Sequence, residues 1–517
     1  MSSAPGAARR PRVSLVMIVR DAAQLIAPAL SSAVGLADEI IVVDTGSTDN
    51  TAATARQLGA NVVCEPWPDD FALARNRAAS YATGDWILWL DAGEQLAGGA
   101  AAELRQFIDS QAAINKAYML LVTVPPAADQ ISGEQVGRVR LVANRKELYF
   151  EGRVRERIEP SIERAGLSIE GLPWRIERGY GEHDVAVKLR RAQRDLKLIE
   201  LEIKELGQEP HQLVGLGEAL SNLGDYARAA AAFRQAIGAA AAGSSLMREA
   251  YYGLMTAGDA QGADRWVQLG ICLEALGVFP LDPQLLCAMG GYLQAQGRLE
   301  LAARAYETAI DQGQIDPWLW HVRDIGEIAA VCLGMVHQLE NDDEQSRVVL
   351  ERAAERWPDS HRVRRQLVDL HVKHDRRREA LAEFDRLVSE PGERELMRSA
   401  VRGACLAAKQ DWAAALPYLQ SAYAGGCRDP FCLRWLAVTL LAESHIEAAE
   451  PILAAWKAVE PRNTELHKYL EALCPATPLA AADPAQHLRV DRPQMQPAQR
   501  ATQTVGRPIS SLLDRPI

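Results

Sequence analysis

Residues 13–21 read VSLVMIVRD, residues 39–51 read EIIVVDTGSTDNT, and residues 85–94 read DWILWLDAGE. Each stretch is a short apolar run that leads into a carboxylate, which is typical of a buried strand followed by a polar turn. Helical patterns lie between the runs, so their order predicts an open α/β sheet. Asp44 and Asp91 would then fall at carboxyl ends of strands, where such sheets bind ligands. This region therefore favours a nucleotide-dependent enzyme.

The composition limits the class of protein. The 517 residues allow about two to four domains. The formal charge of -11, without a long Lys/Arg run, argues against nucleic acid and against a polybasic membrane patch. The scattered cysteines lack a C-x-x-C pair and are typical of buried thiols in a reducing compartment. No apolar run approaches the ~20 residues that span a bilayer. We expect a cytoplasmic protein without a transmembrane segment, and peripheral membrane contact stays open.

The character of the sequence changes near residue 185. Before that point strand-like and helix-like segments alternate, and after it strand-like runs nearly vanish while Ala, Leu, Arg and Glu follow helical spacing. The expected division is a flexible N-terminus at 1–11, an α/β domain at 12–184, a linker helix at 185–209, a helical repeat array at 210–473, and a disordered tail at 474–517.

The helical part repeats with a period of about 34 residues. An alanine usually follows each turn five positions on, and a large apolar residue follows nine positions on, as Ala380 and Phe384 follow Asp375. The predicted turn positions are Gly224, Gly297, Asn341, Asp375, Gln410 and Ser444, with a degraded copy between the first two. This pattern resembles tetratricopeptide repeats. Such helix pairs stack into a solenoid with a concave face for a partner, and a generic helical domain is the alternative.

Several residues near the strand ends are candidates for chemistry. Asp44 can accept hydrogen bonds from a base or ribose, whereas a helix cap in the loop at 47–49 would need no ligand. Asp91 and Glu94 form a carboxylate pair that can bind a divalent metal, whose charge offsets a leaving diphosphate. Arg75 would add a second cation there. The alternatives are a surface ion pair for Arg75 and a solvated strand end.

Together these segments resemble the family 2 glycosyltransferases of the GT-A fold, of the small bacterial type. The resemblance lies in S-L-x-M-I-V, I-I-V-V-D-T-G-S-T-D-x-T, D-D-F-x-x-A-R-N and G-D-W-I-L-W-L-D, which follow one another in order. It implies an α/β GT-A domain followed by an all-α tetratricopeptide-type solenoid. It also implies that Asp44 binds the nucleoside, that Arg75 and Asn76 line the donor site, and that Asp91 opens a D-x-D motif for Mn²⁺ or Mg²⁺.

Several positions depart from the family pattern, and three of them concern the candidate site. Gly93 replaces the second carboxylate of the D-x-D motif, which leaves Glu94 as the tentative second metal ligand. Arg155 and Glu177 stand where the family has histidines.

An inverting transfer needs a base that deprotonates the acceptor hydroxyl. The segment FEGRVRERIEP resembles the family segment Y-x-G-x-V-H-E and retains Glu156, which is the candidate base. The alternative is that Glu156 pairs with Arg153 or Arg157 on the surface.

The predicted function is transfer of a sugar from a nucleotide-sugar, UDP-linked in our expectation, to an acceptor that the repeat array recruits. An extended repeat surface suits a protein acceptor, such as flagellin or another surface protein, better than a small sugar. The resemblance also permits a polysaccharide or lipopolysaccharide acceptor. The alternative is a catalytically inactive, transferase-like scaffold that uses its repeats for protein–protein interaction.

Overall fold

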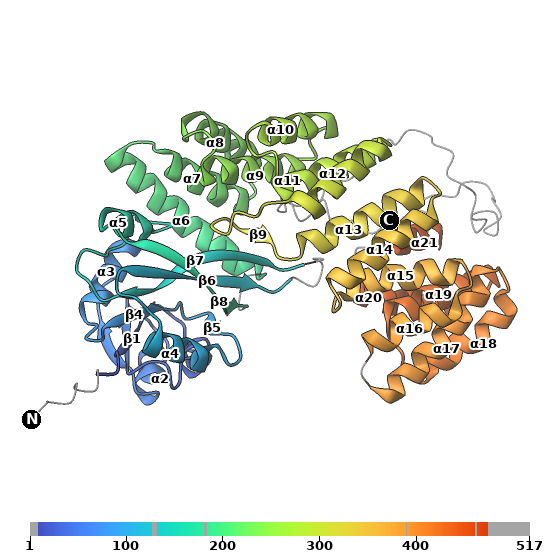
Figure 1. Cartoon of the computed structure of the whole chain (residues 1–517), viewed down its shortest axis with the longest axis horizontal. Helices are drawn as coiled ribbons and strands as arrows, with labels where there is room; N and C mark the ends of the chain where they lie inside the picture. The colour runs from blue at the N-terminus through green and yellow to red at the C-terminus, as the bar shows by residue number, and fades with distance from the viewer. Residues whose placement is uncertain (1–8, 127–131, 180–182, 389, 461–462, 474–517) are drawn as a thin grey trace, which may run out of the picture.

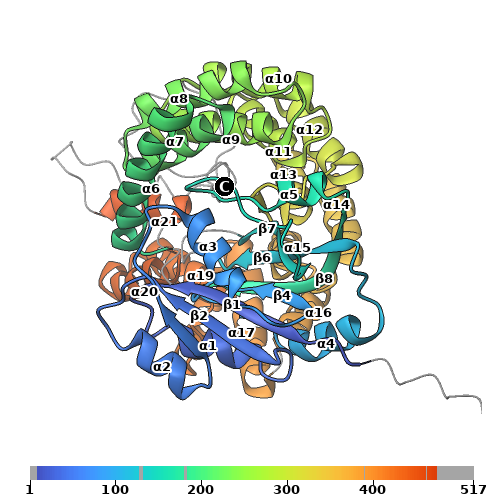
Figure 2. The ribbon, with the colours of Figure 1, turned by 90° about the vertical axis from the view of Figure 1, so that its left-hand side faces the viewer.

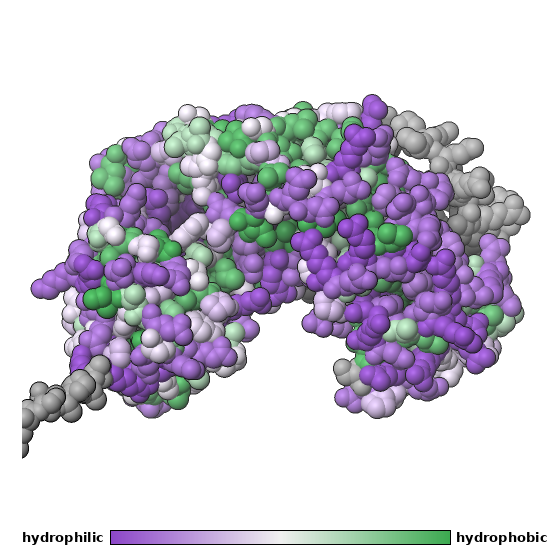
Figure 3. Space-filling view, in the orientation of Figure 1, coloured by the Kyte–Doolittle hydropathy of each residue, from purple (hydrophilic) through white to green (hydrophobic). Residues whose placement is uncertain are grey.

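The computed structural model describes residues 9–126, 132–179, 183–388, 390–460 and 463–473. A strand domain lies at one end, and an arch of helices leads away from it (Figure 1). An open notch with mostly hydrophilic walls separates the strand domain from the later helices (Figure 3). The predicted tail at 474–517 and residues 1–8 of the predicted N-terminal segment lie outside the described residues.

One sheet organises the strand domain, with the order β3-β2-β1-β4-β7-β6-β8-β5. The first strand pairs in parallel with β2 and β4, as expected for three apolar runs separated by helices. The β6–β7 and β4–β7 pairs are antiparallel. The strands are β1 (Val13–Val19), β2 (Glu39–Asp44), β3 (Asn61–Cys64), β4 (Trp86–Trp89), β5 (Glu94–Leu96), β6 (Lys116–Val124), β7 (Glu134–Ala143) and β8 (Ser168–Arg178).

Helices cover both faces of this sheet. Leu15 and Met17 of β1 pack on one face with residues of α1 and α4, whereas Val16 packs on the other face with residues of α3 and α5. The alternation follows from the period of two along a strand. The helices are α1 (Ile26–Ser32), α2 (Thr51–Gln57), α3 (Phe71–Ser80), α4 (Ala100–Ser110) and α5 (Glu159–Arg164).

A long helix, α6 (Val185–Leu206), connects the strand domain to the helical array. The array begins with α7 (Pro210–Asn222), α8 (Tyr226–Ala239), α9 (Ser245–Ala260), α10 (Arg265–Val278), α11 (Pro283–Ala295), α12 (Leu299–Gln312) and α13 (Ile325–Leu339). It continues with α14 (Asp343–Arg356), α15 (His361–Lys373), α16 (Arg377–Leu387), α17 (Pro391–Ala408), α18 (Trp412–Ala424), α19 (Pro430–Ala442), α20 (Ile446–Val459) and α21 (Thr464–Leu473). The first of these helices curve over the sheet in the turned view (Figure 2). Within the described residues, no helix combines the length and the apolar character needed to cross a membrane.

The predicted repeat register is confirmed. All six predicted turn positions have a positive φ, between 54° and 82°. The aligned alanines and large apolar residues are buried, for example Ala380 and Phe384 at 0% and 3% exposure. The degraded copy is the α9–α10 pair, whose turn residue Gly262 also has a positive φ of 70°. Its period differs from the other copies, which explains why the sequence pattern misses it.

The expectation that strands nearly vanish after residue 186 misses one element. The segment between α12 and α13 is longer than a repeat turn and contains β9 (His321–Val322), which pairs antiparallel with β7. The backbone N–H of Gly137 also donates to the carbonyl of Pro317 at 2.5 Å. We call residues 313–324 the strap. It joins the third repeat pair to the central part of the sheet, so sheet and array share backbone hydrogen bonds.

Candidate functional site

A cavity of about 910 Å³ lies where β1, β2 and β4 end. Asp21 follows β1, Thr45 follows β2, and Asp91 follows β4, and all three line the cavity. Helix α6 forms the opposite wall. Because parallel strands bring their carboxyl ends to one edge, turns far apart in the sequence meet here.

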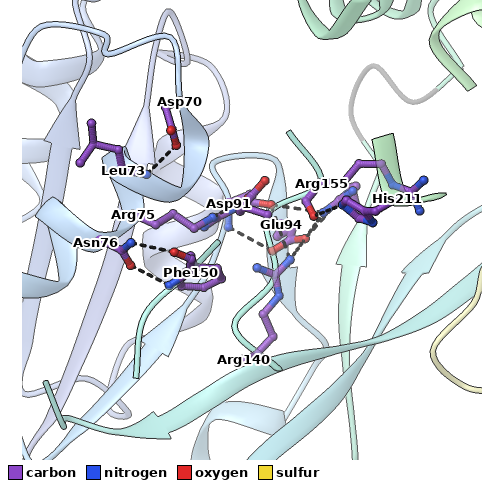
Figure 4. Close-up of polar contacts among 12 residues, drawn as sticks. Asp70, Leu73, Arg75, Asn76, Asp91, Glu94, Arg140, Phe150, Arg155 and His211 are labelled. Carbon is purple, nitrogen blue, oxygen red and sulfur yellow. Dashed lines mark hydrogen bonds and ion pairs between the residues drawn. The ribbon is translucent and has the colours of Figure 1, made fainter. Parts of the chain in front are cut away.

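Arg75 holds two carboxylates of this cavity in place. Its Nη2 donates to Asp91 Oδ1 at 2.8 Å, and its Nε donates to Glu156 Oε1 at 2.7 Å. The guanidinium lies against the edge-to-face pair of Trp89 and Phe150, with its Cζ 5.6 and 5.4 Å from the two ring centres. The side chain of Arg75 points toward Asp91 in the close-up (Figure 4), and its contacts with the two rings help to fix its orientation.

Two further arginines hold the acidic turn after β4. Glu94 is fully buried, and its Oε1 accepts hydrogen bonds at 2.5 Å from both Arg140 and Arg178. Arg178 Nη2 also lies 3.2 Å from Asp91 Oδ2. Glu94 Oε2 accepts the backbone N–H of Asp91 at 3.0 Å, which closes the turn. Three arginines thus surround the carboxylates of Asp91, Glu94 and Glu156.

This arrangement shifts the pKa values of the paired groups. Burial alone would raise the pKa of Asp91, but Arg75, Arg140 and Arg178 outweigh it and hold the pKa well below its ordinary value. Burial would lower the pKa of Arg75, but Asp91 and Glu156 raise it above its ordinary value. The Asp91 carboxylate, which is 32% exposed, is therefore charged near neutral pH and faces the cavity.

The structure places two predicted site residues away from the cavity surface. Asn76 donates from Nδ2 to the carbonyl of Phe150 at 2.9 Å and accepts the Phe150 N–H at 2.8 Å, and it is not among the lining residues. The amide of Asn76 thus holds the backbone beside Arg75, and its role in the donor site stays a prediction. Asp44 is 4% exposed, and its Oδ1 accepts the N–H groups of Gly46 and Ser47. A direct role of Asp44 in nucleoside binding stays a prediction.

Helix α6 contributes a basic wall to the cavity, whereas the sequence pattern predicted this helix only as a linker. Four cationic residues of this helix line the cavity: Arg190, Arg191, Arg194 and Lys197. They are close together because positions three or four apart share one helix face. Arg20 from the β1 turn adds a further cation, and such cations suit a diphosphate. Carboxylates line the cavity as well, since Asp21, Asp69 and Asp195 pair with Arg20, Lys197 and Arg194.

Comparisons with known proteins agree with this geometry. Residues 14–117 match the family model described as glycosyl transferase family 2. The N-terminal part of the chain is a family 2 glycosyltransferase domain. Residues 213–242 match a tetratricopeptide repeat model, and this match covers α7 and α8 of the array.

Similar proteins cover parts of the chain. A TPR repeat-containing protein of Synechococcus elongatus is 41% identical over 165 residues, which are 32% of this chain and 39% of that protein. An uncharacterized glycosyltransferase of Rickettsia felis is 42% identical over 85 residues, 16% of this chain and 30% of that protein. A tetratricopeptide repeat protein structure from Parabacteroides merdae superimposes with a TM-score of 0.38 and 16% identity, covering 51% of this chain and 97% of its own. The chain thus spans less than half the length of these two curated relatives.

The residues of the glycosyltransferase domain fit the expected divalent metal only at Asp91. This carboxylate is exposed to the cavity, and carboxylate oxygens are the ligands that Mg²⁺ and Mn²⁺ prefer. The oxygens of both carboxylates accept hydrogen bonds from arginines, so exposure separates them: Asp91 is 32% exposed, whereas Glu94 is fully buried and also accepts a backbone N–H. In the described part of the chain, no group of three or more His, Cys, Asp or Glu residues is arranged for a metal ion. The contacts of Glu94 stabilise the turn after β4, and its role as the second metal ligand stays a prediction that they do not favour.

Glu156 lies at the cavity but not in the surface pair that was the alternative. Its partner is Arg75, rather than Arg153 or Arg157. Arg153 instead pairs with Glu205 of α6, and Arg155 pairs with Glu249 of α9. The segment at 153–157 thus connects the glycosyltransferase domain to α6 and to the repeats.

Proposed function

We propose that the protein transfers a sugar from a nucleotide-sugar, UDP-linked in our expectation, to an acceptor bound between the glycosyltransferase domain and its repeats. The main support for this proposal is the cavity at the ends of β1, β2 and β4, because Asp91, Arg75 and the basic residues of α6 all line it. A volume of about 910 Å³ is ample for a nucleotide-sugar. The cationic wall supports a donor that carries a diphosphate.

The donor's charge is balanced by residues of two elements. Arg178 and Arg140 lie behind Asp91, and the four cations of α6 face it across the cavity. Asp91 would hold a divalent ion, Mn²⁺ or Mg²⁺, which would neutralise the leaving diphosphate. Because the arginines already fix Asp91, its carboxylate needs little reorganisation when the donor binds.

The acceptor is a protein in this proposal, and flagellin or another surface protein before export is the type we expect. The support is the arch itself: tetratricopeptide pairs offer an extended surface, and the open notch beside them admits a chain rather than only a small sugar (Figure 3). We propose the cytoplasm as the site of the reaction.

Hydrolysis of UDP-sugars by the purified full chain tests this proposal. We expect binding of UDP-glucose or UDP-N-acetylglucosamine and release of UDP, with a loss of activity in EDTA that Mn²⁺ restores. Asp91→Ala should lower the rate by about 100-fold, since it removes the charge that organises the diphosphate site. The matched control is Asp311→Ala, at an exposed position on α12.

Two results would contradict different parts of the proposal. If the full chain binds no nucleotide-sugar with or without Mn²⁺, the protein is a scaffold that uses its repeats for protein–protein interaction. If the wild type hydrolyses UDP-sugars and Asp91→Ala does so at the same rate, the site is wrongly assigned. Transfer to purified polysaccharide but not to any protein would shift the acceptor to a glycan.

A further inference from the structure

We call the cavity of about 910 Å³ at the ends of β1, β2 and β4 the donor cavity. A second chamber, of about 590 Å³, adjoins it. Its walls come from the ends of the sheet and from α6, α7, α9 and the strap. The two cavities share the lining residues Val154, Arg155, Arg178, Arg191 and Asp195. Because Arg178 also contacts Asp91, the shared wall lies beside the place that the donor's diphosphate would occupy.

Arg155 crosses from the glycosyltransferase domain into this chamber. Its backbone has a positive φ of 56°, which is strained for a residue with a side chain. Gly215 of α7 gives it room, since a Cβ there would lie 3.2 Å from Arg155 Cδ. Its Nη2 donates to Glu249 Oε1 at 2.6 Å, and its Nη1 lies 3.5 Å from Glu218 Oε2. A strained residue is thus held between two carboxylates of the repeat array.

Glu218 is placed differently from the other carboxylates near the junction. Glu156 is 15% exposed and bound to Arg75, and Glu249 is 16% exposed and bound to Arg155. The Glu218 side chain is 41% exposed and lines the chamber, with its arginine at the longer distance of 3.5 Å. Of these three carboxylates, Glu218 is therefore the most open to an acceptor hydroxyl.

We propose that this chamber is the acceptor site and that Glu218, supplied by the first repeat pair, is the base that deprotonates the acceptor hydroxyl. This proposal rests on the proposed glycosyltransferase function and replaces Glu156 as the base. The acceptor oxygen forms a bond to the anomeric carbon of the sugar. The bond from that carbon to the diphosphate breaks, and its electron pair leaves with the nucleoside diphosphate. The hydroxyl proton passes to the Glu218 carboxylate.

The surroundings of Glu218 suit a base that works near neutral pH. Although 41% of its side chain is accessible within the chamber, desolvation by the surrounding walls raises the pKa of Glu218 to about 7, Glu249 of α9 and Asp195 of α6 add to the rise, and Arg155 and Arg138 oppose it. The charged groups that face it thus come from α6, α9, β7 and the segment after β7. At a pH above 7 the carboxylate is free to accept a proton, and below 7 it is increasingly protonated.

The test uses UDP-sugar hydrolysis by the full chain, with water as the acceptor in the chamber. We expect Glu218→Gln to lower hydrolysis of UDP-glucose or UDP-N-acetylglucosamine by about 100-fold or more, because a general base contributes about that factor. The dissociation constant for UDP should change by less than about threefold, since Glu218 lies outside the donor cavity. Glu307→Gln, at an exposed position on α12, is the matched control and should behave as the wild type.

The pH profile gives a readout that a structural role would not move. The wild-type rate should fall about tenfold per pH unit below 7, and Glu218→Gln should lose this acid limb. Glu218→Asp serves if the glutamine variant does not fold, and it should keep the limb at a reduced rate. The base assignment is overturned if Glu218→Gln hydrolyses within about threefold of the wild type with the limb intact, or if the folded wild type shows no limb near 7. A wild type that binds no UDP-sugar overturns the proposed function instead.

Discussion

The carboxylate of Glu94 is fully buried between two arginines. A buried ion pair adds little by itself, because desolvation of both charges offsets their attraction. Removing one partner is different, since the other charge is then left without compensation. Arg140, whose side chain is 7% exposed, depends on Glu94 in this way.

Glu94→Gln should therefore destabilise the fold by about 3 kcal/mol. The amide fills the same volume but leaves Arg140 buried without its close counter-charge. Urea unfolding followed by circular dichroism measures the change. Glu307→Gln, on the exposed face of α12, should shift the free energy of unfolding by less than about 0.5 kcal/mol. Equal stability of the two variants would show that Arg140 is compensated elsewhere.

Among the side-chain contacts of the site, some were predictable from the sequence and others were not. The spacing of the motifs indicated that Arg75 would add a cation near Asp91, and the structure brings the two side chains within 2.8 Å. The partners of Glu94 were not predictable, because Arg140 and Arg178 lie 46 and 84 residues away on strands whose order the sequence does not specify. A charged residue in a strand pattern, as Arg140 is in β7, was the available signal.

The helices of the array depend on close contacts between glycines and aromatic rings. Gly217 of α7 and Gly253 of α9 lie on two sides of Phe233, and a Cβ added at Gly253 would lie 2.3 Å from its Cζ. Phe233 is 1% exposed and belongs to the core of the first repeat pairs. The ring therefore fills the space that two missing side chains leave.

Gly253→Ala should destabilise the array by about 1–3 kcal/mol, because the added methyl group displaces the ring. Gly270→Ala is the matched control: it lies in α10, and nothing is within 4 Å of its added Cβ. Since alanine favours helices over glycine, this control should gain up to about 1 kcal/mol. Thermal unfolding of both variants measures the difference, and a shift of the same sign in both would contradict the packing argument.

Elements with a sustained period were predictable, and isolated ones were not. The runs at β1, β2 and β4 and the turns from Asn341 onward repeat a local pattern, so neighbouring residues alone indicate them. Strand β9 has two residues and therefore no period to detect. Helix α6 was predicted as a helix, but its role as a wall of the donor cavity depends on how the two parts pack.

The strap makes the whole molecule one connected unit. Trp318 packs against the core on one face of the sheet, and Trp320 packs against the core on the other. Ser132 Oγ donates to Asp324 at 2.7 Å, which ties the start of β7 to the end of the strap. Because the strap arises between α12 and α13, it fixes the third repeat pair relative to the donor site.

The double substitution of Trp318→Ala with Trp320→Ala should loosen this connection. Each half-buried indole contributes about 2 kcal/mol of burial, so the strap should detach while the repeats stay helical. We expect a larger radius of gyration in small-angle X-ray scattering and faster proteolysis within the strap. Ile315→Ala, in the same segment but 43% exposed, is the control. An unchanged scattering profile would show that α6 alone sets the arrangement.

Because β9 pairs with β7, the sheet is completed late in the synthesis of the chain. The sheet is formed by residues up to 178, but its last strand follows residue 320. At about 5–20 residues per second, a ribosome needs several seconds or more to make the residues in between. Helices α7 and α9 emerge within that interval, so the nascent domain acquires the turns that line the donor cavity first, and the second chamber, whose walls include residues 319–322 of the strap, is completed only when β9 pairs with the sheet.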